Sequence, residues 1–469
     1  LDLWGGVPLY DETTVVSADF MNMLKPRSTE DEVREFIIKD LDAAIASLPK
    51  EWESADKGRA TCGAAMALKG KLYLYNKQYG EALECFKKIA GEPGEVDADK
   101  YATYALYTVP GDAKASYADL FKPADDGKGA DDCSEMIFTI QNLGGVGQDY
   151  GMPMGKYMGS RSTYGSCWHN VMVSTNMADS YETKDGQNYD YSTFQFDWNA
   201  FTGSDYTGNA QIRESIFYCT LNKAEVEAYP TGTIQGVPAL TSGKSRPFEG
   251  PLVEMYEEER DPRMSVSLIC PYTYYLGAVN NKPQDMYFAI TKSAPEPADG
   301  WVKMEGGWLC YLWRKFVPEG DMNGLLNNRE DVPINFPLIR LADVYLMMAE
   351  CYNELDDLDN AAKYVNKVRD RVGMPLINGG DAWMSVTTKE EMFKRIKHER
   401  AVELAAEGHS FSDMRRWGLL EEVGGPVQNI MRTSSKYDRV VRERDYLWPI
   451  PQTEMDINPN LKGHQNPGW

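Results

Sequence analysis

Residues 338–375 read "LIRLADVYLMMAECYNELDDLDNAAKYVNKVRDRVGMP", and this stretch decides the fold. Apolar side chains recur at helical spacing on both sides of the polar run "NELDDLD". The first half is rich in Ala and Tyr, and the second half begins at Leu358 and carries Ala361 three residues later. Gly373, followed by Pro375, ends the second half as a helix commonly ends. The stretch therefore predicts two helices joined by a tight polar turn.

The same arrangement occurs again in the first part of the chain. Residues 61–89, "TCGAAMALKGKLYLYNKQYGEALECFKKI", contain two apolar periodic segments separated near "NKQY". Here Tyr79 and Ala82 take the places that Leu358 and Ala361 have in the other stretch. Such self-similar helix pairs resemble tetratricopeptide repeats in degenerate form.

Two further helices are predicted beside these pairs. In "RSTEDEVREFIIKDLDAAIASLP", residues 27–49, Ser28 and Thr29 offer N-caps, acids fill the first turn, and Pro49 ends the apolar stripe. The block "KEEMFKRIKHERAVELAAEG", residues 389–408, has helical periodicity as well. The fold class predicted from these segments is a mostly α-helical scaffold.

The middle of the chain has a different composition. From about residue 143 to residue 335 it is dense in Gly, Pro, Tyr, Trp, Asn and Ser, with short strands predicted only at "EMIFTIQ" and "RMSVSLI". Loops this long are usually functional or disordered, and the many aromatic residues argue against disorder. We therefore expect an N-terminal helical part over 1–142, truncated at its start, an irregular aromatic-rich lobe over 143–335, and C-terminal helices with a proline-rich tail over 336–469. All three are expected to pack as one composite domain.

Composition excludes several classes of function. The formal net charge of −22 over 469 residues makes nucleic acids and anionic membrane surfaces poor partners. None of the four histidines has a second histidine at ligand spacing, so no metal site is expected. The eight cysteines form no CxxC pair and are interpreted as buried free thiols. No apolar run is long enough for a membrane-spanning helix, and no cofactor is predicted.

Three glutamates stand out as possible catalytic acids. Glu399, Glu403 and Glu407 follow one another at every fourth position and share one helical face. Acids stacked on one helix cannot flank a glycosidic bond from opposite sides, as hydrolysis requires. We interpret them as members of a structural ion-pair network. The expected partners are the nearby arginines Arg395, Arg400, Arg415 and Arg416. No Walker lysine loop, GxSxG elbow or GxGxxG turn is present, so no catalytic residue is predicted.

The acidic run "PADDGKGADDCSE", residues 123–135, offers the oxygen ligands that calcium prefers. The acids from Asp125 to Asp132 do not follow EF-hand spacing. A solvated acidic loop is therefore the favoured interpretation, and calcium binding is left open.

The aromatic residues of the irregular lobe carry more information about function. Trp, Tyr and Phe make up 12% of the chain, and many lie in Gly-rich loops. Sugar rings stack their CH faces on indole and phenol rings, although aromatic rings also pin irregular loops together. We expect this set to contain a ligand-binding platform. Its predicted residues are Trp168, Trp198, Tyr206, Tyr274, Tyr275, Trp301 and Trp308.

Motifs from both ends of the chain resemble one known family. They are "GGVPLY" near the start, "MADSYETKDG" (177–186), "ERDPRM" (259–264), "HERAVELAAEGHSFSDMRRWG" (398–418) and the closing "YLWPIPQTEMDINPNLKGHQNPGW". In this order they resemble the SusD/RagB family of outer-membrane lipoproteins of Bacteroidetes. The resemblance implies a tetratricopeptide-like helical scaffold with an irregular ligand-binding lobe, and it makes the stretch 398–418 part of the scaffold.

The resemblance also implies a function. Members of the family sit on the cell surface, held by an N-terminal lipid anchor that this chain does not contain. They bind oligosaccharides or polysaccharides and form a lid over a SusC-type, TonB-dependent transporter. Capture of peptides is the alternative within the family, and an all-α glycosidase is a more distant one. Because binding residues vary between members, the predicted platform above rests on the aromatic argument alone.

Overall fold

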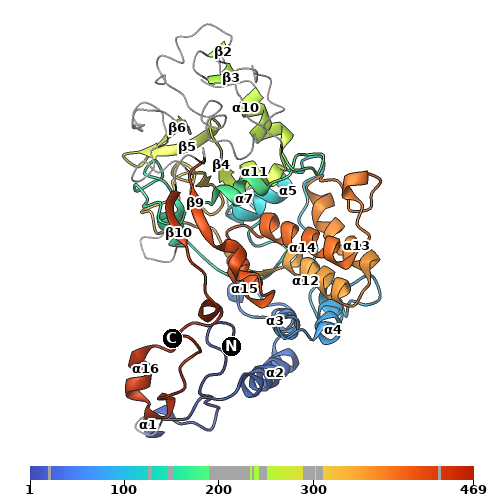
Figure 1. Ribbon diagram of the computed structural model, residues 1–469, viewed down its shortest axis with the longest axis vertical. Helices are drawn as coiled ribbons and strands as arrows, with labels where there is room; N and C mark the ends of the chain where they lie inside the picture. Colours follow the sequence, from blue (N-terminus) through green and yellow to red (C-terminus); the bar gives the residue numbers. More distant parts are fainter. Residues whose placement is uncertain are drawn as a thin grey trace. The chain divides into compact units, whose positions relative to one another are not determined.

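The computed structural model describes residues 1–19, 23–124, 129–144, 151–189, 233–234, 237–241, 251–288, 302, 310–430, 432 and 435–469 (Figure 1). The chain forms two compact units, each assembled from separate stretches. Unit 1 comprises Leu1–Ala102, Gly408–Gly425 and Arg439–Trp469, and unit 2 comprises Thr103–Glu407 and Pro426–Asp438. Unit 1 thus joins segments from both ends of the chain, whereas the three segments predicted above follow the order of the sequence.

Unit 1 contains the first predicted helix pair. Helix α3 (Cys62–Tyr75) packs against α4 (Tyr79–Ala90) and α2 (Glu30–Ser47). The start of α2 has a complete capping box, in which Thr29 and Glu32 each accept a hydrogen bond from the other's backbone N–H. Gly70 lets α3 approach α4 closely, since a Cβ atom there would lie 2.5 Å from the ring of Phe86. The helices predicted over 27–49 and 61–89 are therefore confirmed.

The two ends of the chain also meet inside unit 1. Trp4 and Trp448 pack edge to face with ring centroids 5.9 Å apart. Arg27 donates from Nη1 to the carbonyl of His464 over 2.9 Å. The remaining elements of this unit are α1 (Val16–Asp19), η2 (Ser54–Asp56), α15 (His409–Arg416), η11 (Leu420–Val423), η12 (Glu443–Tyr446), α16 (Gln452–Ile457) and η13 (Pro459–Leu461).

Unit 2 contains the second predicted pair. Helices α12 (Leu341–Glu354) and α13 (Leu358–Arg371) pack on each other, and α14 (Lys389–Glu403) packs on both (Figure 1). Asp357 caps α13 by accepting a hydrogen bond from the N–H of Asn360. Almost every residue of α12 is buried, which makes it the central helix of this group. The predicted mostly α-helical, tetratricopeptide-like scaffold is confirmed.

The rest of unit 2 consists of short elements. The helical ones are α5 (Ala115–Ala118), η3 (Asp119–Phe121), α6 (Met154–Met158), α7 (Thr175–Ser180), α10 (Pro251–Glu254), η7 (Met255–Glu259), α11 (Pro262–Ser267) and η10 (Ala382–Met384). The strands of the described residues form two-stranded sheets only. The pairs are β1 (Met136–Ile140) with β8 (Phe336–Arg340), β2 (Thr233–Ile234) with β3 (Val237–Thr241), β4 (Leu268–Ile269) with β7 (Leu312–Trp313), β5 (Tyr274–Val279) with β6 (Lys282–Tyr287), and β9 (Gly425–Gln428) with β10 (Ser435–Arg439).

One of the two predicted strands is confirmed and the other is wrong for most of its length. The stretch "EMIFTIQ" contains β1. In "RMSVSLI" only Leu268 and Ile269 form a strand, and the preceding residues belong to α11. The reason is local: Asp261 accepts a hydrogen bond from the N–H of Arg263, and Pro262 occupies the first helical position.

The interior of unit 2 includes aromatic and thiol side chains. Phe316 packs against Phe121 with ring centroids 5.3 Å apart, and both rings are buried. Within the described residues the cysteines are free thiols, and all but Cys133 are buried, which confirms the expectation for this part of the chain. None of the helices in the described ranges is long and apolar enough to cross a membrane.

Candidate functional site

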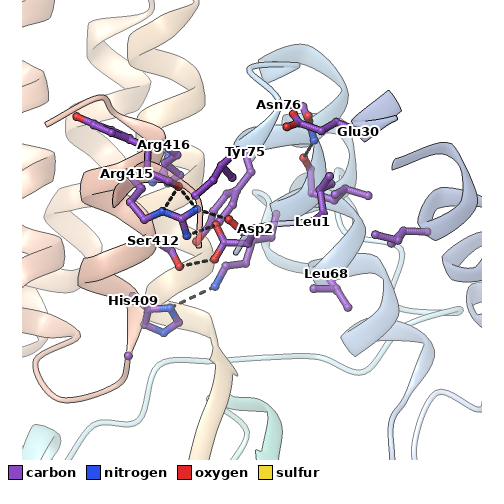
Figure 2. A pocket seen from close by; sticks show the side chains of 16 residues that line it. Leu1, Asp2, Glu30, Leu68, Tyr75, Asn76, His409, Ser412, Arg415 and Arg416 are labelled. Carbon is purple, nitrogen blue, oxygen red and sulfur yellow. Dashed lines mark hydrogen bonds and ion pairs between the residues drawn. The ribbon is translucent and has the colours of Figure 1, made fainter. Parts of the chain in front are cut away.

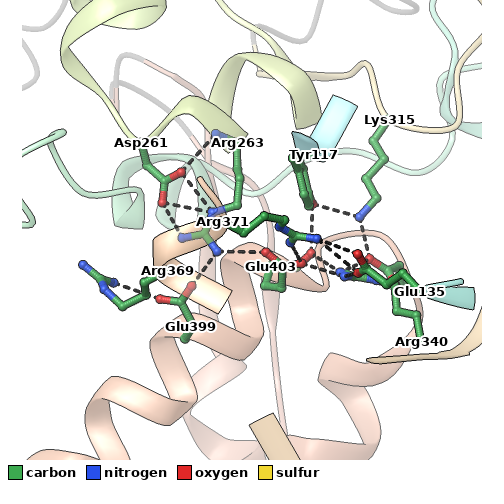
Figure 3. A network of polar contacts seen from close by, with 11 residues as sticks. Tyr117, Glu135, Asp261, Arg263, Lys315, Arg340, Arg369, Arg371, Glu399 and Glu403 are labelled. Carbon is green, nitrogen blue, oxygen red and sulfur yellow. Dashed lines mark hydrogen bonds and ion pairs between the residues drawn. The ribbon is translucent and has the colours of Figure 1, made fainter. Parts of the chain in front are cut away.

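A buried charge network lies along one face of α14 in unit 2 (Figure 3). The side chains of Glu399, Glu403 and Glu407 have lost almost all contact with solvent. They face positive groups that come from α11, α13, β8 and the segment after β7. We define the buried charge network as Glu135, Asp261, Arg263, Lys315, Arg340, Arg369, Arg371, Glu399, Glu403 and Glu407.

Glu403 is the centre of the network. It accepts hydrogen bonds from Arg340 over 2.6 Å, from Arg263 over 2.9 Å and from Arg371. Burial alone raises the pKa of Glu403, but the guanidinium groups of Arg371, Arg340 and Arg263 hold this pKa well below its ordinary value. Glu407 accepts a hydrogen bond from Lys315 over 2.6 Å. Glu403 is therefore ionised, and both carboxylates are bonded within the protein.

The predicted ion-pair network is confirmed, but the arginines that were expected to pair with these three glutamates bond to other groups. Arg395 pairs with Glu182 and Arg400 pairs with Asp343. Arg416 pairs with Asp413 in its own helix. Arg415 donates to the backbone carbonyls of Asp2 and Tyr446, within unit 1. The arginines that bond Glu399 and Glu403 are distant in sequence, and only the tertiary structure brings them together.

The network cannot serve as a catalytic acid pair. A general acid must reach its substrate, and an acid–base pair needs two different environments on either side of a bond. Glu399, Glu403 and Glu407 lie side by side, buried and saturated by cationic donors. Glu399, Glu403 and Glu407 of the stretch 398–418 are therefore structural, in agreement with the family resemblance.

A cavity of about 550 Å³ in unit 1 lies beside the same stretch (Figure 2). Its polar groups are largely bonded to one another. Ser412 donates to the carboxylate of Asp2 over 2.7 Å, and Lys71 Nζ lies 3.2 Å from Nδ1 of His409. The apolar part of the wall includes Leu68 and the ring of Tyr75. None of the platform residues that the structure describes, Trp168, Tyr274 and Tyr275, lines this cavity.

Trp168 lies at the surface of unit 2 in a cluster of rings and cations. Its indole is half-buried and meets Tyr157 edge to face, with ring centroids 5.6 Å apart. Lys156 Nζ lies 4.1 Å from the centroid of the Trp168 ring, and the guanidinium carbon of Arg329 lies 5.1 Å from it. Tyr157, 39% exposed, is the open ring of this Trp168 cluster, which we define as Lys156, Tyr157, Trp168 and Arg329.

The hairpin β5–β6 carries the other two described residues of the predicted platform. Tyr274 is half-buried and donates from its hydroxyl to Asp285 over 2.8 Å. Leu276, on the same face of β5, lines a cavity of about 580 Å³. Tyr275 points to the opposite face and is completely buried, with its hydroxyl 3.1 Å from both Thr163 Oγ1 and the Pro318 carbonyl.

The burial of Tyr275 corrects its predicted role. A ring with no exposed surface cannot stack on a sugar, so this residue acts as an anchor. Its hydroxyl ties the hairpin to the loop that leads to Trp168. Two more bonds join the same parts, from the N–H of Ala278 to the carbonyl of Ser162 over 2.7 Å and from the N–H of Gly165 to Asn281 over 3.0 Å. Trp168 and Tyr274 are therefore held on one framework.

The loops of this framework contain strained backbone conformations. Non-glycine residues with positive φ are uncommon, and they persist where the surroundings enforce them, often at functional sites. Phe316, at φ 62°, is buried and bulky, which makes its conformation a strong outlier. The others in these loops are Ser166, His169, Tyr272, Asn280, Asn281, Met322 and Asn323.

Several predictions concern residues outside the described ranges. They are the platform residues Trp198, Tyr206, Trp301 and Trp308 and part of the acidic loop, Asp125 and Asp126. Of the acidic loop, Asp131 is buried and accepts from the N–H of Ala124 over 2.9 Å and from the N–H of Asn335 over 2.8 Å. No cluster of potential metal ligands occurs among the described residues.

Tyr157 and Trp383, which is 46% exposed, are among the exposed rings outside the predicted set. Tyr157 lies in α6, two residues after Gly155, and Trp383 lies in η10, two residues after the turn "NGGD". Glycine a few residues before an aromatic ring is a signal that could have identified both residues.

Comparisons with known proteins agree on one family. A family model described as the SusD family matches residues 134–469, and one described as "Starch-binding associating with outer membrane" matches residues 1–74. SusD-like protein P25 of Formosa agariphila is 24% identical over 465 residues, which cover 98% of this chain and 68% of that protein.

Solved structures give the same result. A SusD-like protein from Bacteroides fragilis NCTC 9343 has a TM-score of 0.67 and 25% identity, covering 100% of this chain and 76% of its own. A SusD-like carbohydrate binding protein from the same organism has a TM-score of 0.66 and 20% identity, covering 98% and 76%.

Proposed function

This chain belongs to the SusD family, and on that premise we propose that it captures carbohydrate chains at the outer-membrane surface. It then passes them to a SusC-type, TonB-dependent transporter, and a lipid anchor holds it at the membrane. The observation that carries this proposal is the family match over residues 134–469, because this stretch contains both the Trp168 cluster and the hairpin β5–β6. The carbohydrate-binding name of one structural neighbour and the outer-membrane description of the second family model support it.

The proposed ligand surface is the irregular part of unit 2. Among the described residues it includes Tyr157 and Trp168 in one cluster and Tyr274 on the hairpin. Their support is physical: rings on loops that are bonded to a rigid framework lose little freedom when a ligand binds. Trp198, Tyr206, Trp301 and Trp308 remain predicted members of the same surface.

The ligand class is tested by affinity electrophoresis and calorimetry. The protein is offered a panel of neutral and acidic polysaccharides and, beside it, peptide mixtures. We expect retardation and heat with polysaccharides only. Selective binding of peptides would replace the carbohydrate proposal with the peptide alternative. Assaying the same incubations for new reducing ends examines the glycosidase alternative, and appreciable turnover would refute a purely binding role.

The location of the surface is examined with Trp168→Ala. Removing a stacking ring should weaken carbohydrate binding by about 1–3 kcal/mol, with nucleobase stacking on aromatic rings as the nearest measured analogue. Phe411→Ala is the matched control, because Phe411 is 43% exposed but belongs to unit 1. Equal affinities for the two variants would move the ligand surface away from the Trp168 cluster.

The transporter partner is examined in native membranes. The anchored protein, solubilised in a mild detergent, should purify together with a large outer-membrane transporter. A lid over a transporter needs a broad contact area, so the complex should survive purification. A protein that runs alone, with uptake unchanged after deletion of its gene, would refute the partnership.

A further inference from the structure

A second cavity of unit 2 lies away from the Trp168 cluster and shares no lining residue with it. It has a volume of about 590 Å³ and is formed by the turn after α7, by η10 and by the first half of α14. Residues Glu182 to Asn188 supply the turn, whose ends pair through an antiparallel bridge between Glu182 and Asn188. We call it the Trp383 cavity, after the residue that forms its aromatic wall.

Trp383 is exposed but firmly oriented. Its side chain is 46% exposed, although its indole N–H donates to the carbonyl of Asp185 over 2.8 Å. Arg395 donates from Nη2 to the carbonyl of Trp383 over 2.6 Å, and the neighbouring Met384 is fully buried. Gly186 permits this arrangement, because it has φ +75° and a Cβ atom there would lie 3.0 Å from the sulfur of Met384. Hydrogen bonds at the backbone carbonyl and at the indole N–H therefore fix Trp383, while its side chain remains exposed to solvent.

Polar groups with free bonding capacity surround this ring. The amide side chains of Gln187 and Asn188 are exposed and form no hydrogen bond within the described ranges. His398 is one-fifth exposed, but its Nε2 atom is buried and has no hydrogen-bond partner in this part of the chain. That atom lies 3.8 Å from Glu182, which is too far for a direct bond.

The charges of the cavity balance. Glu182 and Glu391 are matched by Lys394 and Arg395 among the lining residues. Arg395 is bonded to Glu182 over 2.7 Å, so its charge is neutralised within the wall. Burial lowers the pKa of His398, which keeps the ring neutral at neutral pH. The wall therefore favours a neutral ligand rich in hydroxyl groups over a phosphate, a sulfate or a charged peptide.

We propose that the Trp383 cavity is a second carbohydrate-binding site, which takes a neutral sugar unit with its apolar face on the ring of Trp383. Hydroxyl groups of the sugar bond to the exposed amide side chains of Asn188 and Gln187. The site would hold a long chain at a second point, so that binding at both points raises the overall affinity for polysaccharides over short fragments. The choice of ligand class rests on the proposed function, whereas the position of the site does not.

The test uses the whole protein, labelled with 5-fluorotryptophan, and fluorine NMR. The resonance of Trp383 is assigned by its loss in Trp383→Phe. Titration with a neutral oligosaccharide that the protein binds should shift this resonance. Trp383→Ala should weaken binding at this site about 5- to 150-fold, which calorimetry records as the loss of one bound ligand per chain.

The control is Trp469→Ala. Trp469 is 45% exposed and its indole N–H also donates to a backbone carbonyl, that of Leu447, over 2.9 Å, but it does not line the cavity. This variant should bind as the native protein does. Asn188→Ala and Trp168→Ala complete the set: the first should weaken only the Trp383 site, and the second only the surface proposed above.

The two proposals fail in different ways. If the native protein binds oligosaccharide while the Trp383 resonance stays in place and Trp383→Ala binds with unchanged stoichiometry, the second site is refuted and the proposed function stands. If Trp383→Ala binds normally but no longer purifies with a membrane protein, this face is a protein interface, which also refutes the second site. Absence of any saccharide binding refutes both proposals.

Discussion

Replacing Glu403 by glutamine should remove about 3–5 kcal/mol from the free energy of unfolding of unit 2. The change keeps the shape of the side chain and removes its charge. In the native protein Glu403 accepts hydrogen bonds from Arg263, Arg340 and Arg371, and all four side chains are buried. An amide oxygen can satisfy only part of these donors, and the new NH₂ group must face an arginine.

The expected loss of stability follows from the carboxylates that each arginine still pairs with after Glu403 is replaced. Arg263 keeps Asp261, and both Arg340 and Arg371 keep Glu135. No guanidinium group therefore loses every carboxylate, and the loss stays near that of breaking one buried ion pair rather than three. For a protein whose stability is typically about 5–15 kcal/mol, this is a large fraction.

Urea unfolding followed by fluorescence measures the loss in the free energy of unfolding. Because the two units need not unfold together, hydrogen exchange at the amides of α14 assigns this loss to unit 2. The control is Glu330→Gln, because Glu330 is 41% exposed and pairs with Lys156 at the surface. An exposed pair is worth about 0–1 kcal/mol. If Glu403→Gln costs no more than Glu330→Gln, the buried charge network does not hold unit 2 together.

Three further predictions concern pH and packing. The pKa of Glu403 is lowered by folding, so its stabilisation is present above about pH 4.3, the unfolded value, and is lost as the pH falls below it. The stability difference between native protein and Glu403→Gln should therefore shrink in urea titrations below about pH 4, and a constant difference would contradict the assigned role. Burial lowers the pKa of Lys315 to about 8. Unfolded lysine titrates near pH 10.4, so native protein should gain stability relative to Lys315→Met between about pH 8 and pH 10, and parallel curves would argue against the lowered value. Gly70→Ala should destabilise unit 1 by about 1–3 kcal/mol, because its Cβ would lie 2.5 Å from Phe86, whereas Gly80→Ala, with nothing within 4 Å, should stabilise it by about 0.5–1 kcal/mol. Thermal melts that move in the same direction for both glycine variants would refute the close contact of α3 with α4.

Much of the scaffold was predictable because its signals are local. The pattern Thr-x-x-Glu at Thr29 and Glu32 specifies the start of α2 within one turn of chain. The period of apolar residues over 338–375 specifies α12 and α13 in the same way. The helix α11 has such a signal as well, because Asp261 caps its start and Pro262 occupies the first helical position, so the strand prediction for "RMSVSLI" was wrong over these residues.

The candidate ligand surface was predictable only in part. The sequence shows that Trp168, Tyr274 and Tyr275 lie in a loop-rich region, but it does not show which ring faces solvent. On a strand, neighbours point to opposite faces, so Tyr274 and Tyr275 had to differ. Which of the two is buried depends on Thr163 and Pro318, more than 40 residues away along the chain. The sequence does not indicate the cavity beside Trp383, because three separate segments form it.

By itself, therefore, the sequence determined the helices, their caps and the mostly α-helical class of the fold, since these depend on residues within a few turns of each other. It also placed Glu399, Glu403 and Glu407 on one face of a helix. Only the tertiary structure decided that their partners are Arg263, Arg340, Arg369 and Arg371 rather than the arginines nearest in sequence. The physical reason is that a buried charge must be paired by whatever element packs over it, and packing is a property of the whole unit.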